Sequence, residues 1–173
     1  IAAEAAPSSA PLMAGILTAG AGDTISVALS SGVTVSGALS SGSASALNGR
    51  LVRVSSPARG KLSVSALGSS DIPGDLDAAA GTLGELELSP DVTVYDQVKG
   101  SGAVEVALSD ILTDTVPASS IAYAGTDSAG QVNLLVLEDV TGNCYTYGFL
   151  EKGEQTGGSG TMQYTNTTVT VDN

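Results

Sequence analysis

Carboxylates are the side chains whose spacing in this sequence comes nearest to a chemical site. Asp71, Asp75 and Asp77 form the densest group, within "DIPGDLD". Calcium takes roughly six to eight oxygen ligands, and a loop of the EF-hand type needs acidic residues at alternate positions with a closing glutamate. "DIPGDLD" lacks this pattern, so we interpret the aspartates as residues that shape turns and a helix start. The sequence leaves open whether calcium binds near them.

Two further pairs of carboxylates could act as acid and base in glycoside hydrolysis. Glu138 and Asp139 are adjacent and would point to opposite faces of a regular strand, and Asp110 and Asp114 flank a predicted loop. Histidine, the commonest general base, is absent from the sequence, and no lysine completes an S-x-x-K pattern. We therefore predict no catalytic residue, no metal ligand and no cofactor, and a protein that is not an enzyme.

Three tyrosines and one cysteine are the other candidates for a site. Tyr123, Tyr145 and Tyr147 could form a surface on which sugars stack, although we favour rings that cover a sheet and leave their hydroxyls at its rim. Cys144 is expected to be a small buried side chain, because no basic residue near it in the sequence would activate the thiol. The residues of any binding site stay unknown at this point.

Four of the six basic residues lie close together in the sequence, at Arg50, Arg53, Arg59 and Lys61. A solvated strand face and turn is the favoured interpretation, and a small basic patch for an acidic partner or wall polymer is the alternative. The net charge of −12 repels phosphate backbones and anionic membrane surfaces. We expect neither nucleic acid binding nor membrane insertion, because the apolar stretch "LMAGILTAGAG" is also too short to span a bilayer.

The elements that must position these residues are built almost without aromatic side chains. Hydrophobic residues make up 42% of the 173 residues but aromatic ones only 3%, and glycine occurs 22 times. Alternation of apolar and polar residues recurs in "DTISVALSSG", "VTVSGALSSG", "RLVRVSSPARGKLSVSAL" and "DVTVYDQV". This pattern predicts an all-β fold class, with short antiparallel strands in two small barrel-like or sandwich-like sheets.

The predicted organisation divides the chain into five segments. They are a flexible lead-in at 1–11, a first β unit at 12–70, a connecting loop at 71–82, a second β unit at 83–152, and a polar linker with a final strand at 153–173. One helical turn is expected near residues 76–80. The start, "IAAEAAPSSAP", is typical of a mature protein after signal removal or of a cloning boundary. The final strand could belong to this unit or to a following domain.

The stretch "DSAGQVNLLVLEDVTGNCYTYG", residues 127–148, is predicted to be the central hairpin of the second sheet. Val132, Leu134 and Val136 should share one face of its first strand, and Leu135 and Leu137 the other. A strand that is apolar on both faces is usually covered on both sides. "EDVTGN" is the expected turn and "CYTYGFL" the expected return strand.

The second half of the chain resembles an uncharacterised all-β module of large secreted proteins of Gram-positive gut bacteria, which often also carry S-layer homology repeats. The similarity covers about residues 83–150, and "DVTG-x-x-Y-T-Y-G" is its most specific part. The matching positions are Val94, Tyr95, 108–111, 117–119, 128–132 and 137–148. The S-layer homology repeat itself is not in this sequence. The resemblance implies an extracellular location, at the bacterial cell surface or in the cell wall, and a supporting or binding role.

These observations predict a non-catalytic accessory module of a bacterial cell-surface or secreted protein, acting as a spacer, an assembly element or an adhesion element. The alternative is a module that binds carbohydrate or cell-wall polymer through a tyrosine face, and a hydrolase fragment is the weakest interpretation. Possible partners are a cell-wall polymer, a glycan or another surface protein. The sequence leaves open the ligand, the oligomeric state and the rest of the parent protein.

Overall fold

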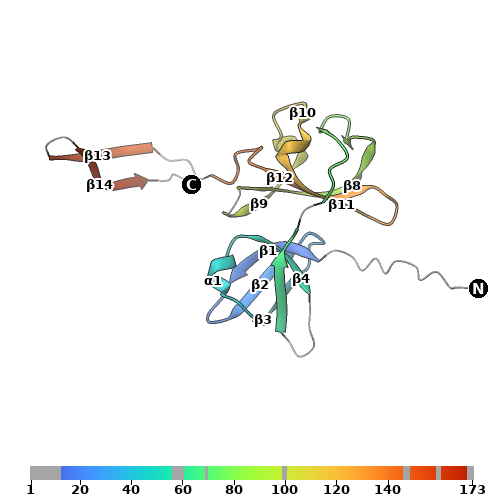
Figure 1. The fold of residues 1–173 in the computed structure, drawn as a ribbon, viewed down its shortest axis with the longest axis horizontal. Coiled ribbons are helices and arrows are strands. Elements are labelled where there is room, and N and C mark those ends of the chain that lie inside the picture. Colours follow the sequence, from blue (N-terminus) through green and yellow to red (C-terminus); the bar gives the residue numbers. More distant parts are fainter. Residues whose placement is uncertain are drawn as a thin grey trace, which may run out of the picture.

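The computed structural model describes residues 13–55, 61–68, 70–98 and 101–145, together with the backbone of 149–158 and 161–170. Two β units lie one above the other, and the chain crosses between them once, after β5 (Lys61–Ala66) (Figure 1). Strands account for 51% of the structure and helices for 8%, which confirms the all-β fold class. Within the described ranges, no helix has the length and apolar character needed to cross a membrane.

The first unit is a closed five-stranded barrel with the strand order β1-β2-β3-β5-β4. Its elements are β1 (Ala14–Ala19), β2 (Thr24–Leu29), β3 (Thr34–Leu39), α1 (Ala44–Leu47), β4 (Leu51–Ser55) and β5. β4 pairs back onto β1, and β3 pairs with β5 in parallel, which closes the barrel. The predicted hairpin that carries the basic residues is confirmed, because β4 and β5 pair antiparallel.

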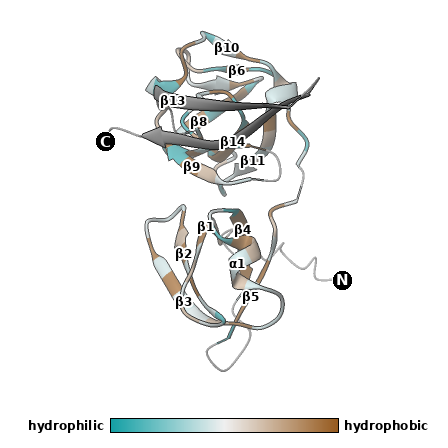
Figure 2. Cartoon of the chain, turned by 90° about the vertical axis from the view of Figure 1, so that its left-hand side faces the viewer, coloured by the Kyte–Doolittle hydropathy of each residue, from teal (hydrophilic) through white to brown (hydrophobic). Residues whose placement is uncertain are grey.

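Alternation along the strands separates the inside of the barrel from its outside. Ile25, Val27 and Leu29 of β2 are buried in its core. Hydrophobic and near-neutral segments alternate along β3 (Figure 2). On the outside, the hydroxyls of Ser26 and Ser36 lie 2.8 Å apart across the β2–β3 pair. The predicted period-two pattern therefore describes this unit correctly.

The second unit is an open seven-stranded sheet with the order β10-β6-β7-β8-β12-β11, and β9 pairs with β8 beside this path. Its strands are β6 (Leu76–Asp77), β7 (Thr82–Leu83), β8 (Leu86–Gln97), β9 (Ala103–Val106), β10 (Thr115–Val116), β11 (Ile121–Thr126) and β12 (Val132–Glu138). Two short 3₁₀ turns, η1 (Leu108–Asp110) and η2 (Ala118–Ser120), connect β9, β10 and β11.

The segment 71–82 carries strand β6 and the start of β7, and the helical turn expected near residues 76–80 is wrong. The Asp77 carboxylate accepts a hydrogen bond from the Ala80 backbone N–H at 2.7 Å, and Gly81 has a φ of 70°. This side-chain acceptor offers the backbone a turn in place of a helix. The turn leads β6 into its antiparallel partner β7.

β12 is an interior strand of the sheet, between β8 on one side and β11 on the other, and both of its faces are buried, as predicted. It pairs antiparallel with β11 but parallel with β8, so these strands are not all antiparallel. The expectation that Val132 shares a face with Leu134 and Val136 is wrong. A shift in register lies between Val132 and Leu134, and it places Val132 in the same core cluster as Leu135 and Leu137.

The predicted hairpin of β12 with a return strand at "CYTYGFL" is not found among the described residues: Cys144 and Tyr145 lie outside any strand, and residues 146–148 lie outside the described part of the chain. β12 instead forms a hairpin with β11, which precedes it, through a turn at residues 127–131. Further along, β13 (Phe149–Gly158) pairs with β14 (Thr161–Thr170) as a separate two-stranded sheet. In the described backbone, the final strand therefore pairs with β13 and not with the sheet of the second unit.

A third apolar cluster joins the barrel to the second unit. Ala14 and Leu51 of the barrel meet Tyr95, Leu134 and Val136 of the sheet, and all five side chains are buried. Two hydrogen bonds cross the same junction. The Ala103 N–H donates to the Gly49 carbonyl at 2.8 Å, and the Thr93 hydroxyl donates to the Ser30 carbonyl at 3.1 Å. The two units therefore pack against each other through a small core of their own.

Candidate functional site

A polar cleft of about 940 Å³ opens where the β2–β3 turn of the barrel meets the second unit. Ser30 and Ser31 form the barrel wall, and residues of β8, β11, β12 and the β11–β12 turn form the opposite wall. The Thr93–Ser30 hydrogen bond joins the two walls. Concave sites between two packed units are common places for small ligands to bind.

A break in strand pairing builds the second unit's wall of the cleft. Val132 of β12 pairs with Leu88 of β8, but Leu134 pairs with Thr93, so β8 has extra residues between these two contacts. Pro90 lies in that interval and has no N–H to give to a ladder. The side chains around it, including the exposed Asp91, therefore leave the sheet pairing and line the cleft.

Tyr123 and Asp127 are placed in the cleft by the β11–β12 hairpin. Asp127 Oδ1 accepts the backbone N–H groups of Ala129 at 2.8 Å and Gln131 at 3.0 Å, which holds the turn. Tyr123 lies half-buried on β11, two residues from Gly125. A β-carbon at Gly125 would lie 3.2 Å from Tyr123 Cε1, so glycine leaves room for the tyrosine ring. The cleft thus combines one aromatic ring with hydroxyl, amide and carboxylate groups.

A buried carboxylate, Asp96, organises the "DVTG" part of the chain. It is 0% exposed, and its Oδ2 accepts the Thr141 hydroxyl at 2.6 Å and the Thr141 N–H at 2.7 Å. The Val140 N–H lies 3.2 Å from both of its oxygens. Asp139, with a φ of 56°, bends the chain into this turn. The "DVTG" segment therefore supports the fold at this position.

Sequence reasoning missed Asp96, although a signal for it exists. It occupies a position in "DVTVYDQV" where the alternation of Val92, Val94 and Val98 calls for an apolar residue. A carboxylate in the middle of a buried face needs several hydrogen-bond donors. The backbone N–H groups and the threonine hydroxyl of the "DVTG" turn supply them.

Cys144 lies beside this turn and is partly buried. Its Sγ donates to the Asp96 carbonyl at 3.1 Å. Burial raises the pKa of the Cys144 thiol, and the negative charge of Asp96 raises it further. A thiol in this setting stays protonated and is a poor nucleophile.

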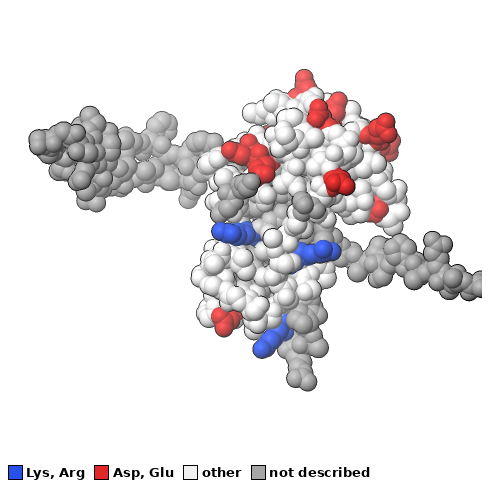
Figure 3. All heavy atoms as spheres, in the orientation of Figure 1, with Lys and Arg blue, Asp and Glu red and all other residues white. Residues whose placement is uncertain are grey.

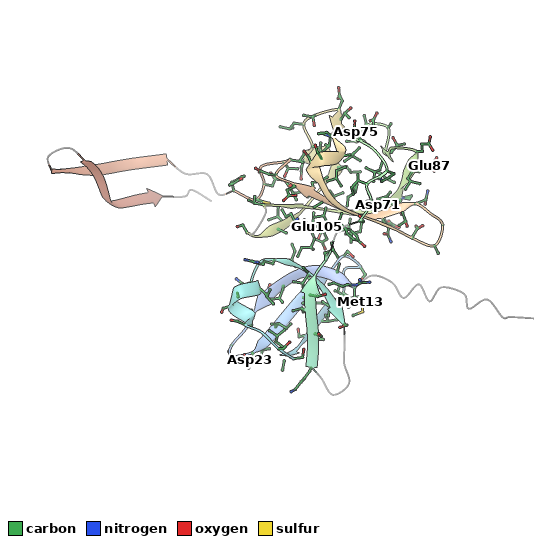
Figure 4. The ribbon with its side chains drawn as sticks, in the orientation of Figure 1. Met13, Asp23, Asp71, Asp75, Glu87 and Glu105 are labelled. Atoms are coloured by element: carbon green, nitrogen blue, oxygen red, sulfur yellow. The ribbon has the colours of Figure 1, made fainter. Side chains whose placement is uncertain are left out.

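The tyrosines singled out in the sequence do not gather in one place within the described residues. Tyr123 lines the cleft, whereas Tyr145 is 46% exposed and donates its hydroxyl to Asp139 Oδ2 at 3.1 Å. Tyr147 lies outside the described residues. A further tyrosine, Tyr95, is buried at the junction of the two units, and burial together with the Glu105 carboxylate raises its pKa to about 12. Glu105 lies on the side of the second unit that faces the barrel (Figure 4).

The aspartates of "DIPGDLD" serve separate places in the second unit. Asp75 Oδ1 accepts the Ala118 N–H at 2.9 Å, and Asp77 holds the turn after β6. Asp71 is exposed, and in Figure 4 it lies apart from Asp75. In the part of the chain that the structure describes, no three His, Cys, Asp or Glu side chains are grouped closely enough to hold a metal ion.

Two of the other carboxylate candidates, Asp110 and Asp139, also have local partners. Asp110 Oδ2 accepts the Ala107 N–H at 3.0 Å and lies 3.4 Å from Asn143 Nδ2, so it ties η1 to the "DVTG" turn. Asp139 accepts the Tyr145 hydroxyl. Asp114 borders a shallow hollow of about 370 Å³ at the other end of the second unit, next to Leu112, which is 93% exposed. The structure does not bring these carboxylates together in the polar cleft.

Charge is unevenly divided between the two units. On the face shown in Figure 3, acidic side chains gather over the second unit, and basic ones lie on the barrel and near the junction. Arg50, Arg53 and Lys61 are exposed on the barrel, and Arg59 lies outside the described residues. None of the three described basic residues lines the cleft, whose charged side chains among the described residues are Asp91 and Asp127.

The barrel offers a second surface to consider. This surface is the outer face of β2 and β3, because small five-stranded barrels such as the OB-fold bind oligonucleotides or oligosaccharides on that face in many proteins. Such faces usually stack bases on aromatic rings. Here β2 and β3 consist of "TISVAL" and "TVSGAL" and contain no aromatic residue. Fold alone carries no function, and this face lacks the side chains for stacking.

Comparisons of the chain with protein-family models, with curated proteins and with solved structures return no match. The site is therefore interpreted from its own geometry.

Proposed function

We propose that this chain is a non-catalytic accessory module of a bacterial cell-surface or secreted protein, and that it acts as a spacer of fixed shape. The observation that carries the proposal is the apolar cluster shared by the barrel and the second unit. The extracellular location rests on the resemblance of residues 83–150 to modules of secreted proteins, and on a composition rich in Ser, Thr and Gly and poor in Lys.

A spacer transmits position only if its parts do not swivel. Units joined by one crossing of the chain are expected to move relative to each other unless their interface is apolar and well packed. Here Tyr95, Leu134 and Val136 are at most 3% exposed at the junction. Burial of one such side chain is worth roughly 1.5–3 kcal/mol, so the cluster favours one arrangement of the two units.

The roles of the carboxylates support a module without catalysis. Asp75, Asp77, Asp96 and Asp110 each accept a backbone N–H through a side-chain oxygen. Hydrogen bonds of this kind fix turns and neighbouring segments, and they give each of these carboxylates a structural role. The arrangement gives less support to binding through a row of tyrosines, because Tyr123 and Tyr145 have different surroundings.

The spacer role is tested by measuring the distance between the units. Spin labels at Thr34→Cys in the barrel and Thr113→Cys in the second unit, both exposed positions, are placed in a Cys144→Ser background. Pulsed electron paramagnetic resonance measures the distance between the two labels and should give one narrow distribution. Leu51→Asp, which puts a charge into the shared cluster, should broaden it, whereas the exposed Ser36→Asp should not. A broad distribution in the unaltered junction would contradict the spacer role.

The alternative, binding to cell-wall polymer through tyrosines, is tested separately. The purified chain is sedimented with isolated Gram-positive cell walls, with and without calcium. Binding that Tyr145→Ala and Tyr147→Ala abolish, in variants that keep their circular dichroism spectrum, would favour the alternative. Absence of binding under both conditions leaves the spacer role as the proposal.

A further inference from the structure

We infer that the polar cleft between the barrel and the second unit is a binding site for a neutral or ammonium-bearing sugar. The inference goes beyond the spacer role and does not depend on it. The volume of about 940 Å³ lies within the range of small-molecule sites, roughly 300–1,000 Å³. The argument rests on what lines this space and on which groups there still lack partners.

The lining carries the two kinds of group that a sugar ring needs. Tyr123 supplies an aromatic ring for the C–H face of the sugar, with Leu134 and Ala124 as apolar neighbours. Hydroxyl and amide groups surround it, among them those of Ser31, Ser128 and Asn133. Sites that orient a polar ligand typically combine an apolar floor with a few such polar groups.

Several of these polar groups are available to a ligand. Asn133 and Ser128 are exposed, and the described residues show no hydrogen bond to either side chain. By contrast, Thr93 is engaged with the Ser30 carbonyl, and Asp127 Oδ1 with two backbone N–H groups. The engaged groups fix the walls, while the free amide and hydroxyl can exchange water for the hydroxyls of a sugar.

The charge of the cleft selects among sugars. Asp91 and Asp127 are its charged side chains, and no lysine or arginine is among the lining residues that the structure describes. The surrounding unit is acidic as well (Figure 3). Phosphate and carboxylate groups are repelled from such a site, and an ammonium group is attracted. An amino sugar should therefore bind more tightly than a neutral one, and a uronic acid should not bind.

The test compares three oligosaccharides of equal length by isothermal titration calorimetry on the intact chain, at an ionic strength of about 0.15 M to limit long-range attraction. They are tetraglucosamine, its N-acetylated form and tetragalacturonate. We expect the glucosamine form to bind about fivefold more tightly than the acetylated one, which corresponds to about 1 kcal/mol, and the uronate to show no heat of binding.

Variants locate the binding. Asn133→Ala and Tyr123→Ala should each weaken the binding of both the glucosamine and the acetylated form. For Tyr123→Ala we expect about a tenfold loss of affinity. Tyr123 also packs at the junction, so its substitution could unfold the protein. If Tyr123→Ala does not fold, the result for Asn133→Ala decides the test. Asp91→Asn should remove the preference for glucosamine and leave the acetylated ligand unchanged. Tyr145→Ala, outside the cleft, is the matched aromatic control.

Glu85→Gln is the matched charge control, because it removes one exposed carboxylate from the same unit outside the cleft. An equal loss of glucosamine binding in Glu85→Gln and Asp91→Asn would mean general attraction to an acidic protein, and would overturn the inference. Failure of the glucosamine and acetylated forms to bind would overturn it too, as would binding of the uronate. None of these results bears on the distance distribution that tests the spacer role.

Discussion

The barrel and the open sheet form their cores with different kinds of side chain. The barrel encloses aliphatic residues such as Leu17, Ile25 and Val27, and its strands pair around a closed ring. The second unit also buries Tyr95 and the carboxylate of Asp96, and it pairs strands that are distant in the sequence. A closed ring of strands leaves no edge to protect, and the strand pairs of this barrel show no register shift, whereas β8–β12 and β11–β12 do.

In the second unit, the irregular positions are therefore the ones whose side chains leave the strand pairing and become accessible. The break in register between β8 and β12 opens one wall of the cleft, and the turn around Asp96 brings Cys144 and Tyr145 to its end of the sheet. The barrel contributes only a turn, at Ser30 and Ser31. Most of the side chains that line the cleft therefore come from the second unit.

The strongest test of the barrel's tight closure is Gly15→Ala. A β-carbon at Gly15 would lie 2.0 Å from the Ala28 carbonyl oxygen of the paired strand, so β1 and β2 would have to separate. We expect a loss of about 3 kcal/mol in the free energy of unfolding, measured in urea. Gly130→Ala in the second unit meets no atom within 4 Å but has a φ of 82°, so it should cost only about 1 kcal/mol. Equal losses of stability in the two variants would contradict an unusually close approach of β1 and β2 at Gly15.

The second unit's dependence on a buried charge is tested by Asp96→Ala. The substitution leaves the N–H groups of Val140 and Thr141 without their acceptor. We expect a loss of about 2–3 kcal/mol in urea unfolding. Asp91→Ala, an exposed change on the same strand, should alter stability by no more than about 0.5 kcal/mol. A small loss of stability in Asp96→Ala would mean that the N–H groups of Val140 and Thr141 have other acceptors in the variant.

The coupling between the two regions is tested by Leu51→Ala, matched with Leu39→Ala. Both leucines are nearly buried, but Leu51 belongs to the shared cluster and Leu39 to the barrel core. Each should cost about 2 kcal/mol or more. In calorimetry, Leu51→Ala should split unfolding into two transitions, whereas Leu39→Ala should lower the barrel's stability without splitting. Identical traces for the two variants would contradict a distinct shared cluster.

A smaller effect is expected at alkaline pH, through Tyr95. Its pKa of about 12 in the folded protein exceeds the usual 10.0, because burial disfavours the phenolate. Between these values the unfolded chain releases the proton and the folded protein keeps it, so stability is complete below pH 10 and falls as the pH rises toward 12. From about pH 9 to about pH 11, we expect a loss of about 1 kcal/mol that Tyr95→Phe does not show. Urea unfolding of both proteins across this pH range measures the loss. An equal loss in Tyr95→Phe would contradict the assignment to Tyr95.

The smallest effect concerns the thiol of Cys144. Because its pKa is raised by burial and by Asp96, its reaction with a thiol reagent should be slower in the folded protein than in the urea-unfolded chain. The difference in reaction rate between the folded and the unfolded chain should shrink as the pH rises. Thiolate absorbance during a pH titration gives the same information directly. A faster reaction in the folded state would show that the site activates the thiol.

The individual strands of the barrel could be predicted from local pattern, but the pairs that close it, β1 with β4 and β3 with β5, could not. Ile25, Val27 and Leu29 point inward, and Val52 and Val54 face away from Leu51, as their alternation implies. The pairing of β8 with β12 could not be predicted in this way, since nothing local specifies a parallel partner. The register shift that moves Val132 to the other cluster has no signature in the alternation either.

The candidate cleft was largely hidden from sequence reasoning. Ser31, Asp91 and Asn133 are ordinary turn and strand residues until distant segments bring them together. Tyr123 is the one cleft residue that aromatic chemistry singled out beforehand. Of the carboxylates that drew attention by their spacing, Asp77 holds the turn after β6, and Asp75 ties its loop to the 3₁₀ turn η2.

The parallel pairing of β8 with β12 also has a consequence for the order of folding during synthesis. The barrel strands can pair as soon as β5 has been made, but the pairing of β8 with β12 must wait until Val132 and the residues after it emerge. Non-local pairs of this kind form slowly and leave strand edges open in the meantime. The finished barrel already presents Ala14 and Leu51, on which Tyr95, Leu134 and Val136 settle. The barrel thereby acts as a template, and a nascent second unit without it would be the part most prone to aggregate.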